Sequence, residues 1–179
     1  MNFRSSVGFE DGVKAGNSVL NLISEITPAL RETCEVSTPE EQLNPIFDWI
    51  EEFGGKKFEY LEGFLSRIIK PQEVEGEIVT LWGADEFIKN QTQYAPICNI
   101  PTSAKIFQFG YWGGDLCDGD GWCIDLQEEN VICVCVTGGY DDPNQVRQEA
   151  YGVMPKLNYF SAWLRASAED RGWLEKNRG

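Results

Sequence analysis

The spacing of apolar residues changes at Pro71, and this change constrains the fold more than any other feature of the sequence. Before Pro71, apolar residues recur every three or four positions, the spacing that places them on one face of an α-helix. After it, short apolar segments separated by turn residues are typical of β-strands. Helices followed mainly by strands predict an α+β domain with an antiparallel sheet.

Apolar stripes predict three helices before Pro71, at residues 17–33, 38–53 and 58–69. Thr38 is expected to cap the second of these helices through its hydroxyl, because threonine is a favoured N-cap residue. Pro39 then occupies the first helical position, where its missing N–H is not needed.

The part after Pro71 predicts one antiparallel or mixed sheet of about four to six strands, packed with helices. Strands are expected at residues 77–82 and 104–110, with a short helix directly after the first. The segments 121–126 and 131–136 flank the polar residues QEEN, which predicts an antiparallel hairpin. Because residues 131–136 are apolar on both faces, this strand is expected in the middle of the sheet. A C-terminal helix is expected from Leu157.

The chain is expected to form a single domain over residues 1–179. Residues 1–55 would be a helical extension, and residues 56–179 the sheet-bearing core. The N-terminus has no apolar segment of signal-peptide length, and no apolar run is long enough to span a bilayer. We therefore expect a cytoplasmic protein whose six cysteines stay reduced.

The chain has 15 Lys+Arg against 29 Asp+Glu, a formal charge of −14, and no histidine. A chain this acidic repels phosphate backbones, so we expect no nucleic-acid partner. The absence of histidine excludes Ser-His-Asp triads, Cys-His dyads and HExxH zinc sites. A basic protein is the partner that the charge favours.

The most distinctive segment, residues 109–126, combines glycines with acids and aromatic rings in the sequence FGYWGGDLCDGDGWCIDL. Between Lys105 and Arg147 the chain has eight acids and no base. If these residues gather at one end of the sheet, they form a negative face with aromatic anchors for a cationic protein. The predicted contact residues are Tyr111, Trp112, Asp115, Asp118, Asp120, Trp122, Glu128, Glu129, Tyr140, Asp141 and Asp142.

Other interpretations of this segment stay open. Its acidic turns could simply be solvated, and its tryptophans could cap a core. Alternatively, a hydrolase or transferase could hold Mg²⁺ or Ca²⁺ with carboxylates. However, the spacing of Asp115 and Asp118 does not follow the calcium-loop order. The carboxylates that would carry this alternative are Asp115, Asp118, Asp120 and Asp125.

Four of the six cysteines lie between residues 117 and 135, at intervals that do not fit the close ligand pairs of a zinc site. Cys133 and Cys135 lie in an apolar run and are expected in the core. Cys117 or Cys123 could be a nucleophile, but the sequence offers neither a histidine base nor a nearby cation. We therefore expect no catalytic residue, no metal and no cofactor.

Residues 78–168 resemble the SUKH superfamily, which includes the fungal cell-wall assembly regulator and many bacterial toxin-immunity proteins. The resemblance is carried by IVTLWGADEFIKNQTQY, IFQFGYWGGD, WCIDL, VICVCV and LNYFSAWLRA. It implies an α+β domain that binds proteins without catalysis. Its bacterial members bind and neutralise a cognate toxin, often a nuclease, in the cytosol. A regulatory scaffold with an endogenous partner, as in the fungal members, is the alternative that the resemblance leaves open.

Overall fold

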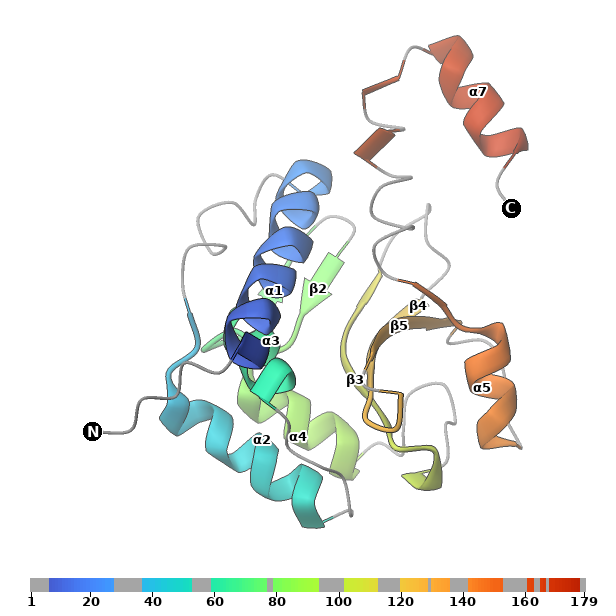
Figure 1. The fold of residues 1–179 in the computed structure, drawn as a ribbon. Coiled ribbons are helices and arrows are strands. Elements are labelled where there is room, and N and C mark those ends of the chain that lie inside the picture. Colours follow the sequence, from blue (N-terminus) through green and yellow to red (C-terminus); the bar gives the residue numbers. More distant parts are fainter. Residues whose placement is uncertain are drawn as a thin grey trace.

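Four helices from the N-terminal half cover one face of an antiparallel sheet, and a shorter helix covers the other face (Figure 1). The computed structural model describes residues 7–27, 37–52, 59–76, 79–93, 102–112, 120–128, 130–135, 142–152, 161–162, 165–166 and 168–177. The four covering helices are α1 (Val7–Ile26), α2 (Glu40–Glu52), α3 (Glu59–Ile68) and α4 (Ala84–Gln93). Helices α2 and α3 lie where the apolar spacing predicts them, and α4 is the short helix expected directly after the strand at residues 77–82.

Helix α1 begins ten residues before the predicted start at Asn17. Its first half holds three glycines four residues apart, Gly8, Gly12 and Gly16. Glycine disfavours an isolated helix, so composition argues against a helix in this segment. Here the glycines face α3, and packing between the two helices determines the structure.

The backbones of α1 and α3 are in direct contact. A Cβ atom added at Gly12 would lie 2.0 Å from the carbonyl oxygen of Tyr60, and one added at Gly63 would lie 2.1 Å from that of Phe9. Because Gly8 lies beside Glu59 and Gly16 beside Arg67, the two helices run in the same direction. Only glycine allows the two backbones to lie this close together, since any side chain would displace the opposite backbone.

Within the described residues the sheet has six strands in the order β1-β2-β3-β4-β5-β6, and each neighbouring pair is antiparallel. The fold class expected from the sequence is therefore confirmed. The strands are β1 (Val74–Glu75), β2 (Val79–Leu81), β3 (Ile106–Trp112), β4 (Asp120–Asp125), β5 (Asn130–Cys135) and β6 (Tyr151–Gly152).

The predicted hairpin around QEEN is formed by β4 and β5, in which Asp125 pairs with Asn130. Strand β5 was expected in the middle of the sheet. It is paired on both sides, but β6, its outer neighbour, is only two residues long. The centre of the sheet is formed by β3 and β4.

Side chains on both faces of β4 are buried, which explains the three consecutive apolar residues Trp122, Cys123 and Ile124. Trp122 and Ile124 belong to a large cluster that also contains residues of α1, α2, α3 and α4. Residues of the predicted N-terminal extension and of the predicted sheet-bearing part therefore share one core. Cys123 faces the opposite side, toward a smaller cluster that includes Val146 of α5 (Pro143–Glu149) and Ala104 of the 3-10 helix η3 (Thr102–Ala104).

The C-terminal part of the chain contacts α1 through polar side chains. Glu25 accepts hydrogen bonds from the hydroxyl of Ser161 and from the guanidinium of Arg165. Residues 157–160, where the C-terminal helix was expected to begin, lie outside the described residues, and helix α7 (Ala168–Lys176) follows further along. Among the described helices, none has the length and apolar character needed to cross a membrane.

Candidate functional site

The residues predicted to form an acidic contact surface fall into three groups in the structure. Tyr111, Trp122, Glu128 and Asp142 have described side chains. Trp112 and Asp120 are placed in β3 and β4 by their backbone. The other five predicted residues, Asp115, Asp118, Glu129, Tyr140 and Asp141, lie outside the described residues.

Trp122 does not lie on the surface. Its side chain is 0% exposed and packs against Phe109, with the ring centroids 6.1 Å apart. The prediction that it contacts a partner is therefore wrong, because the alternation along β4 directs it into the core together with Ile124. Tyr111 is partly buried and packs beside Trp82, whereas Glu128 and Asp142 are exposed.

The predicted acidic residues do not all gather at one end of the sheet. Residues 113–119 connect β3 to β4 at one end, whereas the turn that carries Glu128 connects β4 to β5 at the opposite end. The six residues of β4 separate the two ends by roughly 20 Å. The condition for a single acidic face, that the glycine-rich loop and the QEEN turn lie at one end of the sheet, is therefore not met, since consecutive turns of antiparallel strands alternate between ends.

Asp125 is a structural residue. Its carboxylate is 2% exposed and forms a bidentate ion pair with Arg147, at 2.7 Å from Oδ2 to Nε and 2.8 Å from Oδ1 to Nη2. Oδ1 also accepts hydrogen bonds from the backbone N–H groups of Gln127 and Glu128. Both oxygens are thus occupied, so the alternative in which Asp125 holds a divalent cation is wrong for this residue.

The ion pair also connects three elements of the fold. Arg147 comes from α5, Asp125 ends β4, and Nη2 of Arg147 donates a further hydrogen bond to the carbonyl oxygen of Ala104 in η3. The hydrogen bonds that Arg147 donates to the carboxylate of Asp125 raise the pKa of the guanidinium above its usual value. Within the described part of the chain, no group of three or more Cys, Asp or Glu side chains is placed to share a metal ion.

Helix α2 presents a stripe of carboxylates that the sequence analysis missed. Successive residues of an α-helix are rotated by about 100° around its axis, and on this basis the exposed acids of α2 fall within about 120° of its circumference. The helix has no Lys or Arg. The buried residues occupy the opposite side of the helix. We call the five acids the α2 stripe: Glu40, Glu41, Asp48, Glu51 and Glu52.

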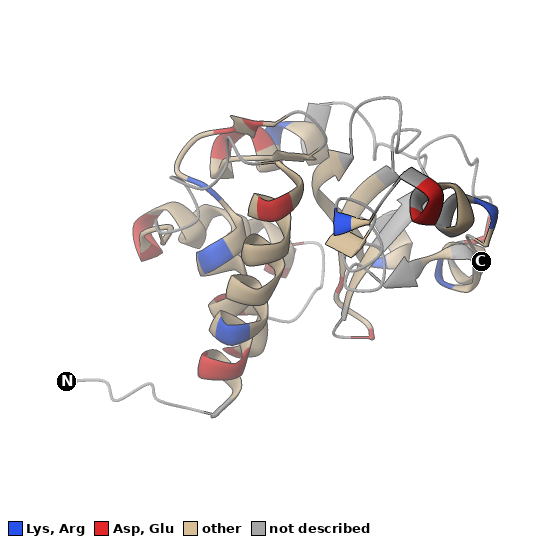
Figure 2. Ribbon diagram, turned by 90° about the horizontal axis from the view of Figure 1, so that it is seen from above, with Lys and Arg blue, Asp and Glu red and all other residues tan. Residues whose placement is uncertain are grey.

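The signal for the α2 stripe was present in the sequence, as five acids without a base over residues 40–52. It was overlooked because the longer interval between Lys105 and Arg147 contains more acids. Figure 2 shows that the acidic residues are spread over the helices as well as the sheet side of the molecule.

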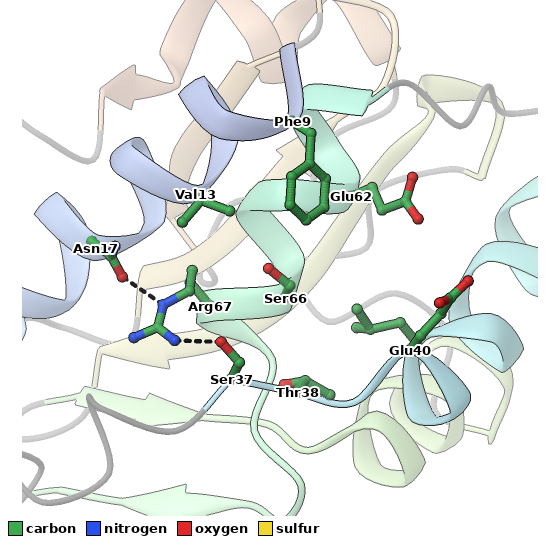
Figure 3. Close-up of a pocket in the computed structure, with 10 residues that line it drawn as sticks. Phe9, Val13, Asn17, Ser37, Thr38, Glu40, Glu62, Ser66 and Arg67 are labelled. Atoms are coloured by element: carbon green, nitrogen blue, oxygen red, sulfur yellow. Dashed lines mark hydrogen bonds between the residues drawn. The ribbon is translucent and has the colours of Figure 1, made fainter. Parts of the chain in front are cut away.

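A cavity of about 520 Å³ opens between α1, α2 and α3 (Figure 3). Its apolar lining comes from Phe9 and Val13 of α1 and from Leu43 of α2. Glu40 and Glu62 lie on one side of it in Figure 3, and Arg67 lies on the other. The cavity therefore combines an apolar wall with carboxylates at one side.

The guanidinium of Arg67 is held at its side of the cavity by two neighbours. Nε donates a hydrogen bond to Oδ1 of Asn17, and Nη1 donates one to Oγ of Ser37, with a donor–acceptor distance of 2.5 Å in each. These bonds connect α3 to α1 and to the segment that enters α2. Figure 3 shows the guanidinium directed toward Asn17 and Ser37 and away from the two glutamates.

Thr38, which also lines the cavity, does not cap α2 as predicted. The residue is 4% exposed and its Oγ1 has no hydrogen-bond partner, while its backbone N–H donates to the carbonyl oxygen of Ser66 at 2.7 Å. The cap is absent because this backbone bond fixes Thr38 against α3. A buried hydroxyl without a partner destabilises the fold by about 1–3 kcal/mol.

Thr38→Val is therefore expected to raise the free energy of unfolding by about 1 kcal/mol, because a methyl group replaces the unpaired hydroxyl. Urea denaturation measures the change. Thr38→Ser is the control: it retains the hydroxyl, loses the methyl and is expected to lower the stability by about 1 kcal/mol. A loss of stability in Thr38→Val as large as in Thr38→Ser would show that the hydroxyl is bonded after all.

Comparisons with protein-family models, with curated proteins and with solved structures find no match for this chain.

Proposed function

We propose that this protein is a non-catalytic binding domain of the immunity type, which neutralises a basic protein toxin by contacting it through acidic surface. The observation that carries the proposal is the α2 stripe, five exposed acids on one side of a helix that has no base. The formal charge of −14 gives the whole chain the same preference for a basic partner. The resemblance of residues 78–168 to the SUKH superfamily supports the same function.

Helix stability does not explain the second half of the α2 stripe. Glu51 and Glu52 lie in the last turn, where the helix dipole disfavours negative charge. Asp48 lies three and four residues before them, at spacings where like charges repel by about 0.2–0.5 kcal/mol per pair. These three acids therefore weaken the helix that carries them. A function outside the helix, namely recognition of a positively charged surface, accounts for them.

Charge complementarity of this kind mainly accelerates association and excludes wrong partners. Two of the other predicted contact residues, Glu128 and Asp142, are exposed acids. Asp142 caps α5, which covers the face of the sheet opposite to α2, so it lies apart from the α2 stripe. Asp115 and Asp118 of the glycine-rich loop would add to the negative charge of the chain. Because Trp122 is buried, aromatic anchoring would depend on Trp112, Tyr111 and Tyr140.

The charge reversal Glu51→Lys/Glu52→Lys is expected to slow association with the toxin about tenfold or more at low salt and to leave the melting temperature unchanged or slightly higher. The proposal predicts that a toxin domain is encoded in the neighbouring reading frame, and surface plasmon resonance with that domain as the partner gives the association rate. Asp115→Lys/Asp118→Lys tests the loop in the same way. Glu169→Lys/Asp170→Lys on α7 makes an equal change in charge elsewhere and serves as the control.

Two results would contradict the proposal. One is the absence of a complex between the wild-type chain and that toxin domain at low salt, together with no rescue of growth on co-expression. The other is an association rate that does not change with salt, since exposed charges are screened within about 10 Å at 0.1 M.

A further inference from the structure

The cavity between α1, α2 and α3 has the chemistry to receive one side chain of a particular kind. Its volume of about 520 Å³ falls within the range of about 300–1,000 Å³ that is usual for binding pockets. Phe9, Val13 and Leu43 would contact an aliphatic stem. Glu40 and Glu62 would contact a charge at its end.

The charges around the cavity favour a cation. Glu40 and Glu62 line it, and Glu10, Glu41 and Glu59 occupy the first turns of the same three helices. Among the described residues that line the cavity, Arg67 is the one cation, and its guanidinium donates hydrogen bonds to Asn17 and Ser37 on the other side. A ligand that reaches the carboxylates therefore meets a negative potential.

We propose that this cavity receives a lysine or arginine side chain of the partner protein, with its stem on the apolar wall and its charged group beside Glu40 and Glu62. This inference rests on the proposed function, because it assigns the contact point of the basic partner. It places that contact on the helices, next to the α2 stripe, rather than on the glycine-rich loop. A pocket at one end of the α2 stripe would act as an anchor for association that the charges of the stripe accelerate.

Side-chain mimics test the cavity without the partner. Nα-acetyl-arginine methylamide and Nα-acetyl-lysine methylamide are titrated into the isotope-labelled protein, and the methyl signals of Val13 and Leu43 are followed by NMR. We expect saturable shifts with a dissociation constant on the order of 1–10 mM, as suits a ligand of this size. The variant Glu40→Gln/Glu62→Gln is expected to bind about fivefold or more weakly.

The matched control is Glu51→Gln/Glu52→Gln, which removes the same charge from the far end of α2 and is expected to change mimic binding by less than about twofold. Equal binding of the uncharged mimic Nα-acetyl-norleucine methylamide would overturn the inference, since the cavity would then be merely apolar. Stronger binding of Nα-acetyl-glutamate methylamide would also overturn it, because Arg67 would then define an anion site. Absence of saturable shifts with every mimic would equally refute it.

The same variants separate this inference from the proposed function. If the toxin domain binds the wild type and Glu40→Gln/Glu62→Gln equally well, the cavity is not the contact point, and the proposed function stands. If the toxin domain does not bind the wild type, the proposed function fails, and the mimic titration still decides whether the cavity takes a cationic side chain.

Discussion

Gly12→Ala is expected to lower the free energy of unfolding by about 3 kcal/mol, the upper part of the usual range for overpacked sites. The new Cβ would lie 2.0 Å from the carbonyl oxygen of Tyr60 and 2.8 Å from the backbone nitrogen of Phe64. Both obstacles are backbone atoms, so α1 and α3 must separate to accommodate one methyl group. At an unobstructed helical site the same change would stabilise the protein by about 0.8–1.0 kcal/mol. The clash outweighs that gain, and urea denaturation gives the difference.

Two other glycines serve as controls for this prediction. At Gly8 the nearest atom to an added Cβ is 3.5 Å away, and at Gly172 nothing lies within 4 Å. Gly8→Ala and Gly172→Ala are therefore expected to be neutral or stabilising by up to about 1 kcal/mol. If Gly12→Ala were as stable as Gly8→Ala, the two helices would not be in backbone contact.

Arg147→Met is expected to destabilise the protein by about 3–5 kcal/mol, because it leaves the buried carboxylate of Asp125 without its counter-ion. The substitution removes two hydrogen bonds to Asp125 and one to the carbonyl oxygen of Ala104. Methionine retains much of the aliphatic stem of arginine, so most of the loss of stability comes from the ion pair. Denaturant unfolding of the single variants measures this loss of stability.

The double variant Asp125→Asn/Arg147→Met distinguishes an unpaired charge from lost packing. Because asparagine is uncharged, the double variant is expected to be more stable than Arg147→Met alone, with a coupling of about 1–3 kcal/mol between the two sites. Additive effects would mean that Arg147 stabilises the fold independently of Asp125. The bidentate geometry at 2.7 and 2.8 Å argues against that outcome.

Much of the fold could be predicted from local patterns in the sequence. Leu43, Ile46 and Ile50 recur at helical spacing and are all buried in α2. The apolar segments on either side of QEEN form the predicted hairpin, since a short polar turn between two apolar strands leaves few other arrangements. These elements were predictable because each buries a face that its own sequence defines.

Features that depend on distant parts of the chain could not be predicted in this way. Gly12 disfavours a helix until Tyr60 of α3 is placed beside it. Asp125 resembles an exposed loop acid until Arg147, 22 residues later, pairs with it. Trp122 lies among acids and glycines in the sequence, but the pleat of β4 directs it into the core. In each case the partner that determines the residue's role is remote in sequence.

The order of strands in the sheet has a consequence for how the protein is made. Every strand pairs with the strand that precedes it in the chain, from β1 through to β6. In such a sheet the partner of each new strand has already been synthesised, so the sheet can grow one strand at a time as the chain leaves the ribosome. Helices α1 to α3 precede β1 in the sequence and are synthesised before the sheet, whereas α4 follows β2 and α5 follows β5.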